Sequence, residues 1–60
     1  MFRVTWVMYG DEIWIGDFST YELAVEACEY TKRLEYYENG IEFITFSIWY
    51  EGHLFDEITL

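Results

Sequence analysis

With 60 residues, 12 acidic side chains and three basic ones, the chain carries a formal net charge of −9 and has room for a single domain, residues 1–60. Its 53 % hydrophobic and 23 % aromatic content argues against disorder, and its charge argues against nucleic acid or an anionic membrane as a direct partner. The single cysteine, Cys28, excludes an intramolecular disulfide, so a core this small must be stabilised by its aromatic content or by association.

The first two predicted elements form a β-hairpin. Residues Phe2–Tyr9 and Glu12–Phe18 both alternate with the two-residue period of a strand. Gly10-Asp11 is typical of a tight turn between them, and Gly16 indicates a bulge or a strand end. In the first strand, one face carries Phe2, Val4, Trp6 and Met8, and the other carries Arg3, Thr5, Val7 and Tyr9.

A helix is predicted over about Thr20–Tyr37. Ser19 and Glu22 have the spacing of a capping box, in which the Ser19 hydroxyl accepts the amide hydrogen of Glu22. Phe18 and Leu23 have the spacing of a hydrophobic staple around the same start. An apolar stripe is expected to face the core, formed by Leu23, Ala24, Ala27, Thr31 and Leu34.

The remaining elements complete the predicted sheet. Asn39-Gly40 is expected to end the helix, because both residue types tolerate a left-handed backbone. The pattern then predicts a long strand over Ile41–Tyr50, a tight turn at Glu51-Gly52 and a fourth strand over His53–Leu60. The predicted fold class is therefore α+β: an antiparallel sheet of three to four strands in β-β-α-β-β order, with one helix packed on one face.

Large apolar side chains occupy both faces of the predicted strands, although one helix covers only one face. Apolar patches larger than a few hundred Å² mark interaction surfaces, and tryptophan and tyrosine are enriched at their centres. We therefore expect the open face or a strand edge to bind a second copy or a partner, with Trp6, Trp14 and Trp49 as apolar anchors. The alternative is that the rings fold over and shield one another.

No pattern in the sequence predicts catalysis, a cofactor or a metal site. Asp11-Glu12 and Asp56-Glu57 are expected to be solvated, because a domain of this size has little room for a pocket that shifts a carboxylate pKa. His53 has no second histidine with which to bind a metal, and Cys28 is expected to be a small buried side chain. Since phosphate-binding glycine loops and nucleophile elbows are also missing, the sequence indicates a binding protein and not an enzyme.

The acidic residues are the most informative feature. Glu22, Glu26 and Glu29 fall at i, i+4 and i+7, which predicts one row on the outer face of the helix. Arg33 follows Glu29 by four residues and is placed to pair with it. Like charges one turn apart cost a few tenths of a kcal/mol, and solubility needs a net charge of only about 2 to 8. We therefore expect the row to serve recognition.

Such a row can imitate the phosphates of a nucleic-acid backbone, because carboxylates one helical turn apart are about 6 Å apart between Cβ atoms. It would occupy the basic groove of a protein that normally binds nucleic acid. Asp11 and Glu12, beside the first predicted turn, are expected to extend the acidic contact surface.

In size, acidity, aromatic content and lack of catalytic residues, the whole chain resembles the small inhibitors that bacteriophages encode. These include anti-CRISPR proteins, anti-restriction proteins and the acidic inhibitor of uracil-DNA glycosylase. The resemblance is one of overall character. It implies a DNA mimic, or a blocker of a host nucleic-acid enzyme, that acts in the host cytoplasm.

Two functions remain in view. The first is non-enzymatic inhibition of a basic, nucleic-acid-handling protein such as a nuclease. The second is a small homodimeric structural or assembly module whose acidity serves solubility only. The first residues predict no signal peptide, no stretch predicts a transmembrane helix, and the unpaired cysteine favours a reducing cytoplasm.

Overall fold

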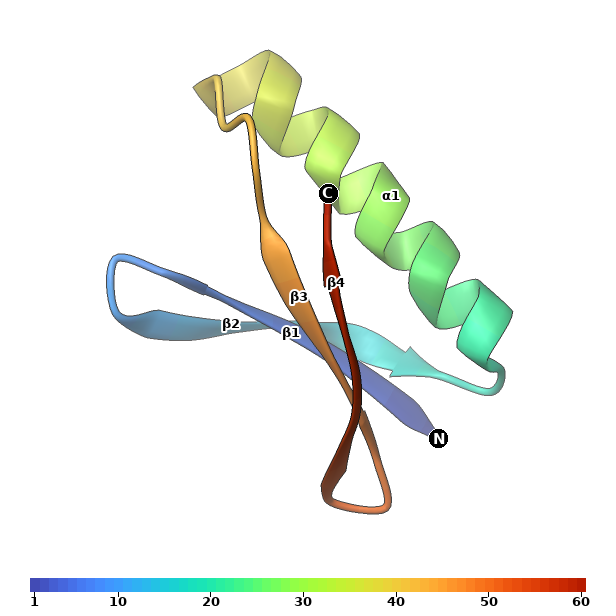
Figure 1. Ribbon diagram of the computed structural model, residues 1–60. Helices are drawn as coiled ribbons and strands as arrows, with labels where there is room; N and C mark the ends of the chain where they lie inside the picture. The colour runs from blue at the N-terminus through green and yellow to red at the C-terminus, as the bar shows by residue number, and fades with distance from the viewer.

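A computed structural model describes all 60 residues as one four-stranded antiparallel sheet with one helix on one side of it (Figure 1). The elements are β1 (Phe2–Met8), β2 (Asp11–Phe18), α1 (Tyr21–Asn39), β3 (Thr45–Tyr50) and β4 (His53–Thr59). The strand order across the sheet is β2-β1-β3-β4, so each hairpin contributes one central and one edge strand. The predicted α+β class and β-β-α-β-β order are confirmed.

Both hairpins close through two-residue turns with left-handed backbone at both positions. In the first, Tyr9 and Gly10 have φ of 53° and 83°, and in the second, Glu51 and Gly52 have φ of 53° and 78°. Such turns match the right-handed twist of the flanking strands, which explains their frequency in hairpins. The second turn lies where it was predicted. The first is centred one residue earlier than predicted, because Asp11 already pairs with Met8.

Each edge strand contains a β-bulge, and each bulge turns an acidic side chain outward. In β2, Thr5 pairs with Trp14 but Val4 pairs with Gly16, so Ile15 is the extra residue, next to the glycine that indicated a bulge. Without the bulge, Asp17 would lie opposite Phe2, whose side chain is on the same face of the sheet as the helix. The bulge places Asp17 opposite Arg3 on the open face instead.

The bulge in β4 has the same effect on the second hairpin. Trp49 pairs with Leu54 but Ile48 pairs with Asp56, which leaves Phe55 as the extra residue. Beyond this point Glu57 lies opposite Ser47 on the open face, and Ile58 lies opposite the buried Phe46. A continuous register would have reversed these two side chains, because a slip of one residue exchanges the faces of a strand.

The helix begins one residue later than the predicted capping box requires. Thr20 is the N-cap: its backbone is extended, and its Oγ1 accepts a hydrogen bond from the amide of Leu23 at 3.1 Å. The prediction that Ser19 caps the helix through Glu22 is therefore wrong, and Phe18 and Leu23 no longer have staple spacing. At the other end, Gly40 has φ of 66° and ends the helix, as predicted.

The core lies between α1 and the sheet, and it consists of small helix residues against larger residues of β1, β3 and the segment that leads into β3. Its buried members are Val4, Trp6, Ala24, Cys28, Ile44, Phe46 and Ile48. Ala24 and Cys28 face the sheet, whereas Leu23 and Leu34 are 44 % and 40 % exposed. The predicted core-facing stripe is thus wrong for the two leucines, because the sheet-facing positions are the ones where small side chains allow close approach.

The third strand is shorter than predicted. Its pairing with β1 and β4 begins at Thr45 or later, whereas the prediction placed the start of the strand at Ile41. Residues 41–44 instead connect the end of α1 to the sheet (Figure 1). Ile44 still exchanges two backbone hydrogen bonds with Leu60, of 2.8 and 2.9 Å, which ties this connection to the end of the chain.

Candidate protein-binding surface

The outer face of α1 presents the predicted row of carboxylates to solvent. Glu22, Glu26 and Glu29 are all exposed, and none takes part in an ion pair. The expected pair between Glu29 and Arg33 does not form, since Arg3–Asp17 is the one ion pair in the structure. These three carboxylates are therefore free to meet cations from another molecule. We call this set the acidic row.

A second row of side chains runs beside the acidic row along the same helix. Tyr30 and Tyr37 are 58 % and 83 % exposed, and Leu23 and Leu34 are exposed to a lesser extent. With the half-buried Ala27, these side chains follow one another at steps of four, three, four and three residues. That spacing forms a continuous stripe on a helix, and we call it the apolar row. Leu23, Ala27 and Leu34 were predicted in a stripe facing the core. An exposed row that includes Tyr30 and Tyr37 was not predicted, although the repeated spacing was the signal that could have revealed it.

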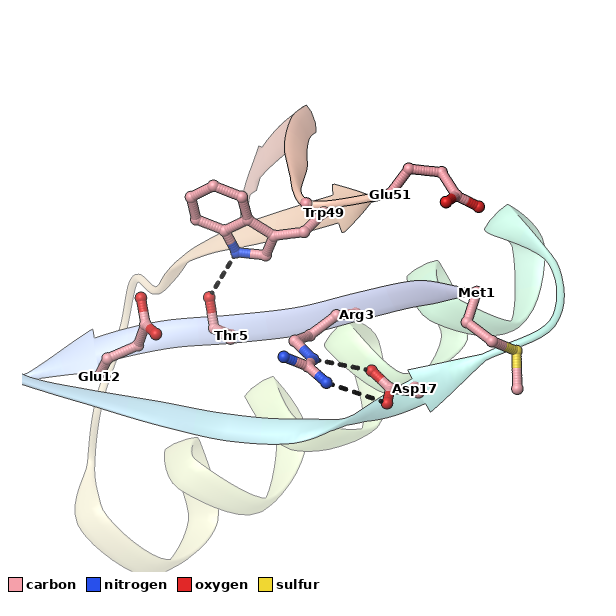
Figure 2. Close-up of a pocket in the computed structure, with 8 residues that line it drawn as sticks. Met1, Arg3, Thr5, Glu12, Asp17, Trp49 and Glu51 are labelled. Carbon is pink, nitrogen blue, oxygen red and sulfur yellow. Dashed lines mark hydrogen bonds and ion pairs between the residues drawn. The ribbon is translucent and has the colours of Figure 1, made fainter.

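The open face of the sheet holds a shallow groove with a volume of about 450 Å³. Figure 2 shows its side chains on the face opposite α1, with Arg3 and Asp17 reaching toward each other across β1 and β2. Arg3 Nε donates to Asp17 Oδ1 at 3.0 Å, and Nη2 donates to Oδ2 at 3.4 Å. This hydrogen-bonded pair lowers the pKa of Asp17 and raises the pKa of Arg3, because each charge stabilises the other.

The three predicted tryptophan anchors lie in three different environments. Trp6 is only 6 % exposed and belongs to the core, so it presents little surface to a partner. Trp49 is half-buried on the open face, where its Nε1 donates to Oγ1 of Thr5 at 2.9 Å (Figure 2). Trp14 is 60 % exposed. Its partner in the sheet is Thr5, so it also lies on the open face.

The remaining predicted contact residues are separated from the acidic row. Asp11 and Glu12 are exposed at the start of β2, at the tip of the first hairpin (Figure 1). The acidic row begins only after β2 has run its full length, at the opposite end of that strand. Glu12 lines the groove on the open face. The structure therefore brings Glu22, Glu26 and Glu29 together and leaves Asp11 and Glu12 on another part of the surface.

Aromatic rings outside the core gather at the end of the sheet nearest the start of α1. The cluster consists of Phe2, Tyr21, Tyr50 and Phe55, with ring centroids 4.7 to 6.3 Å apart. The Tyr21 hydroxyl donates to Oδ2 of Asp56, and this bond raises the pKa of Tyr21. Asp56 and Glu57 do not act as a pair, because they lie on opposite faces of the sheet.

Few other side chains could bind a metal ion or act as a nucleophile. No three His, Cys, Asp or Glu side chains are arranged to hold a metal ion. Cys28 is fully buried, as expected, and burial raises the pKa of its thiol to about 11, so it stays protonated at neutral pH. His53 is exposed at the start of β4.

The one helix falls short of the apolar content that a membrane-crossing segment needs. Comparison with known proteins adds no relative: no family model, curated protein sequence or solved structure matches the chain.

Proposed function

We propose that this protein is a non-enzymatic acidic binding protein, and that its acidic row binds the cationic surface of a nucleic-acid-handling protein and blocks it. The observation that supports the proposal is the exposure of Glu22, Glu26 and Glu29 in one line without any intramolecular cation. Exposed carboxylates in this state do not have to break a native ion pair before they bind arginine or lysine.

The geometry of the row suits a surface that normally holds phosphates. A step of four residues along a helix is about 6 Å, and a step of three is about 4.5 Å. Successive carboxylates are therefore spaced on the scale of successive phosphates along a strand. Glu22 lies in the first turn of α1, where the helix dipole favours a negative charge. The net charge of −9 would also speed the encounter with a basic target.

The resemblance to small phage-encoded inhibitors, which include anti-CRISPR and anti-restriction proteins, supports the choice of target class. We place the protein in a reducing cytoplasm, where the free thiol of Cys28 would persist. Within the candidate surface, Trp14 is the one predicted tryptophan anchor that is mainly exposed, and it lies on the open face, away from the acidic row.

A capture experiment with charge-matched variants tests the proposal. The first variant, E22Q/E26Q/E29Q, removes the acidic row, and the control variant, E42Q/E51Q/E57Q, removes three exposed acids outside α1. Each variant loses three of the nine net negative charges, so the two differ only in where the charge is lost. Each immobilised protein is incubated with a bacterial lysate, and the bound proteins are identified.

We expect the wild type and the control variant to retain a basic nucleic-acid-binding protein, and the row variant to lose it. Duplex DNA and salt above about 0.5 M should each displace the captured protein, since both compete with or screen the carboxylates. Equal capture by the two variants, or capture that DNA does not displace, would contradict the proposal.

A further inference from the structure

The apolar row has the spacing of a coiled-coil seam. Leu23, Ala27, Tyr30, Leu34 and Tyr37 occupy alternating d and a positions of a heptad repeat, because they are separated by four, three, four and three residues. The sheet does not use this seam: the helix residues buried against it are Ala24 and Cys28. A helix in a globular protein usually has one apolar stripe, so a second one in water is an unpartnered packing surface.

We propose that two copies of the chain associate through this row, with their helices antiparallel. In an antiparallel pair, a positions of one helix pack against d positions of the other. Two antiparallel registers pair four of the five residues of the row with a partner residue. The one we propose places Leu23 against the partner's Leu34, and Tyr30 against the partner's Ala27. By two-fold symmetry each of these contacts occurs twice, which gives four layers. A large ring of the seam thus lies opposite its smallest side chain, as close packing requires.

The charges beside the seam select the same register. Glu26 and Arg33 occupy the two g positions, on one side of the row, and both are exposed. In the antiparallel register described above, each Glu26 lies opposite the partner's Arg33, so the dimer gains two ion pairs. On the other side, the e positions in this register are Ala24, which is buried against the sheet, and Thr31, and neither carries a charge. Neither side of the seam therefore places like charges opposite each other.

This charge pattern favours a second copy over another kind of partner. Arg33 is the one cation at a position flanking the seam, and it follows the acidic row along the same side of the helix. If the seam bound a cationic surface, Arg33 would face another positive charge. Opposite the partner's Glu26, it is neutralised. The two acidic rows would then border the same side of the helix pair, because g positions of antiparallel helices lie on one side.

The association should be weak and should strengthen with salt. One helix pair buries less than a standard interface of about 1,600 Å², so we expect a Kd on the order of 10–100 µM. Each copy carries a charge of −9, and salt screens the repulsion between two such bodies. The inference does not depend on the proposed binding function, and the two respond to salt in opposite directions.

Sedimentation equilibrium of the wild type and five variants tests the proposal, with circular dichroism to confirm that each one folds. E26R and R33E each place like charges opposite each other in the dimer, and E26R/R33E restores opposite charges with the wild-type net charge. E42R has the same net charge as E26R but changes a site off the helix. The fifth variant, L34E, puts a charge into the seam itself, at a position that is 40 % exposed.

We expect E26R and R33E each to raise the dissociation constant about tenfold or more, and the double variant to return it to within about threefold of the wild type. L34E should be monomeric, and E42R should bind as tightly as the wild type or more tightly. A wild type that stays monomeric at about 1 mM in about 0.5 M NaCl would overturn the proposal. Single charge variants that dimerise normally, or a double variant that stays weak, would overturn the antiparallel register.

Discussion

The open face of the sheet and the outer face of the helix are both in water, but they differ in how their polar groups are used. On the open face, polar side chains are paired with one another across neighbouring strands. The pairs are Arg3–Asp17, Trp49–Thr5 and Thr45–Thr59. On the outer face of α1, the acidic row has no cation, and four of the five side chains of the apolar row are exposed.

The difference shows that exposure alone does not identify a binding surface. A partner that docks on the open face must compete with hydrogen bonds that the protein already makes to itself. A partner that docks on α1 meets carboxylates that have no partner within the protein. It also meets apolar side chains whose burial is favourable. The sequence pattern favoured the sheet for the apolar contact, and Trp14 is exposed there. The structure adds a continuous apolar row on the helix.

The largest expected loss of unfolding free energy follows from removing a ring on the open face, and a ring on the helix serves for comparison. Trp49→Ala removes a half-buried indole and leaves the buried Thr5 without its hydrogen-bond donor, which should cost about 2–3 kcal/mol of unfolding free energy. Tyr30→Ala removes a ring that is mostly in water and should cost about 0.5 kcal/mol or less. Urea denaturation of both variants measures the difference, and equal losses would show that the two faces do not differ as described.

The start of the helix is the next most sensitive point, because the first turn carries Glu22 of the acidic row. Thr20→Ala removes the hydroxyl that accepts the Leu23 amide and should destabilise the protein by about 1 kcal/mol. Ser19→Ala is the matched control and should change the unfolding free energy by about 0.3 kcal/mol or less, since Ser19 makes no capping bond. If Ser19→Ala proved the more harmful change, the cap assignment would be wrong.

The helix cap also shows how much of the fold could be predicted from the sequence. Strand order along the chain and the turns followed from two-residue alternation and glycine, because both signals act locally. The identity of the cap did not follow, since serine and threonine both cap helices well and Ser19 and Thr20 stand side by side.

The larger error of the sequence-based prediction was the orientation of the helix, and this error has a physical cause. Leu23 and Leu34 suggested the core side because they share a three- and four-residue repeat with Ala24, but the helix residues buried against the sheet are Ala24 and Cys28, with Val25 packed beside them. A helix with two apolar stripes leaves this choice open until its partner is known. The Arg3–Asp17 pair was equally beyond the sequence, because it depends on the bulge at Ile15.

Lowering the pH should destabilise the protein by weakening the Arg3–Asp17 ion pair on the open face. Asp17 has a pKa below that of the unfolded chain, so the stability it contributes is present above the unfolded pKa. That stability is lost as the pH falls through the lower pKa of the folded state. The variant D17N should therefore show a smaller loss of unfolding free energy between about pH 5 and pH 2 than the wild type. The matched variant E57Q, which alters an unpaired acid on the same face, should keep the wild-type slope.

The smallest expected effect is on the outer face of α1, where E22Q/E26Q/E29Q should change the unfolding free energy by no more than about 0.5 kcal/mol. Removing Glu26 and Glu29 relieves repulsion within the acidic row, while removing Glu22 loses a favourable contact with the helix dipole. The two effects oppose each other, and none of the three charges takes part in an ion pair. Thermal unfolding at low salt measures the sum. A loss above about 1 kcal/mol would mean that the row stabilises the fold, which would remove the reason for assigning its charge to recognition.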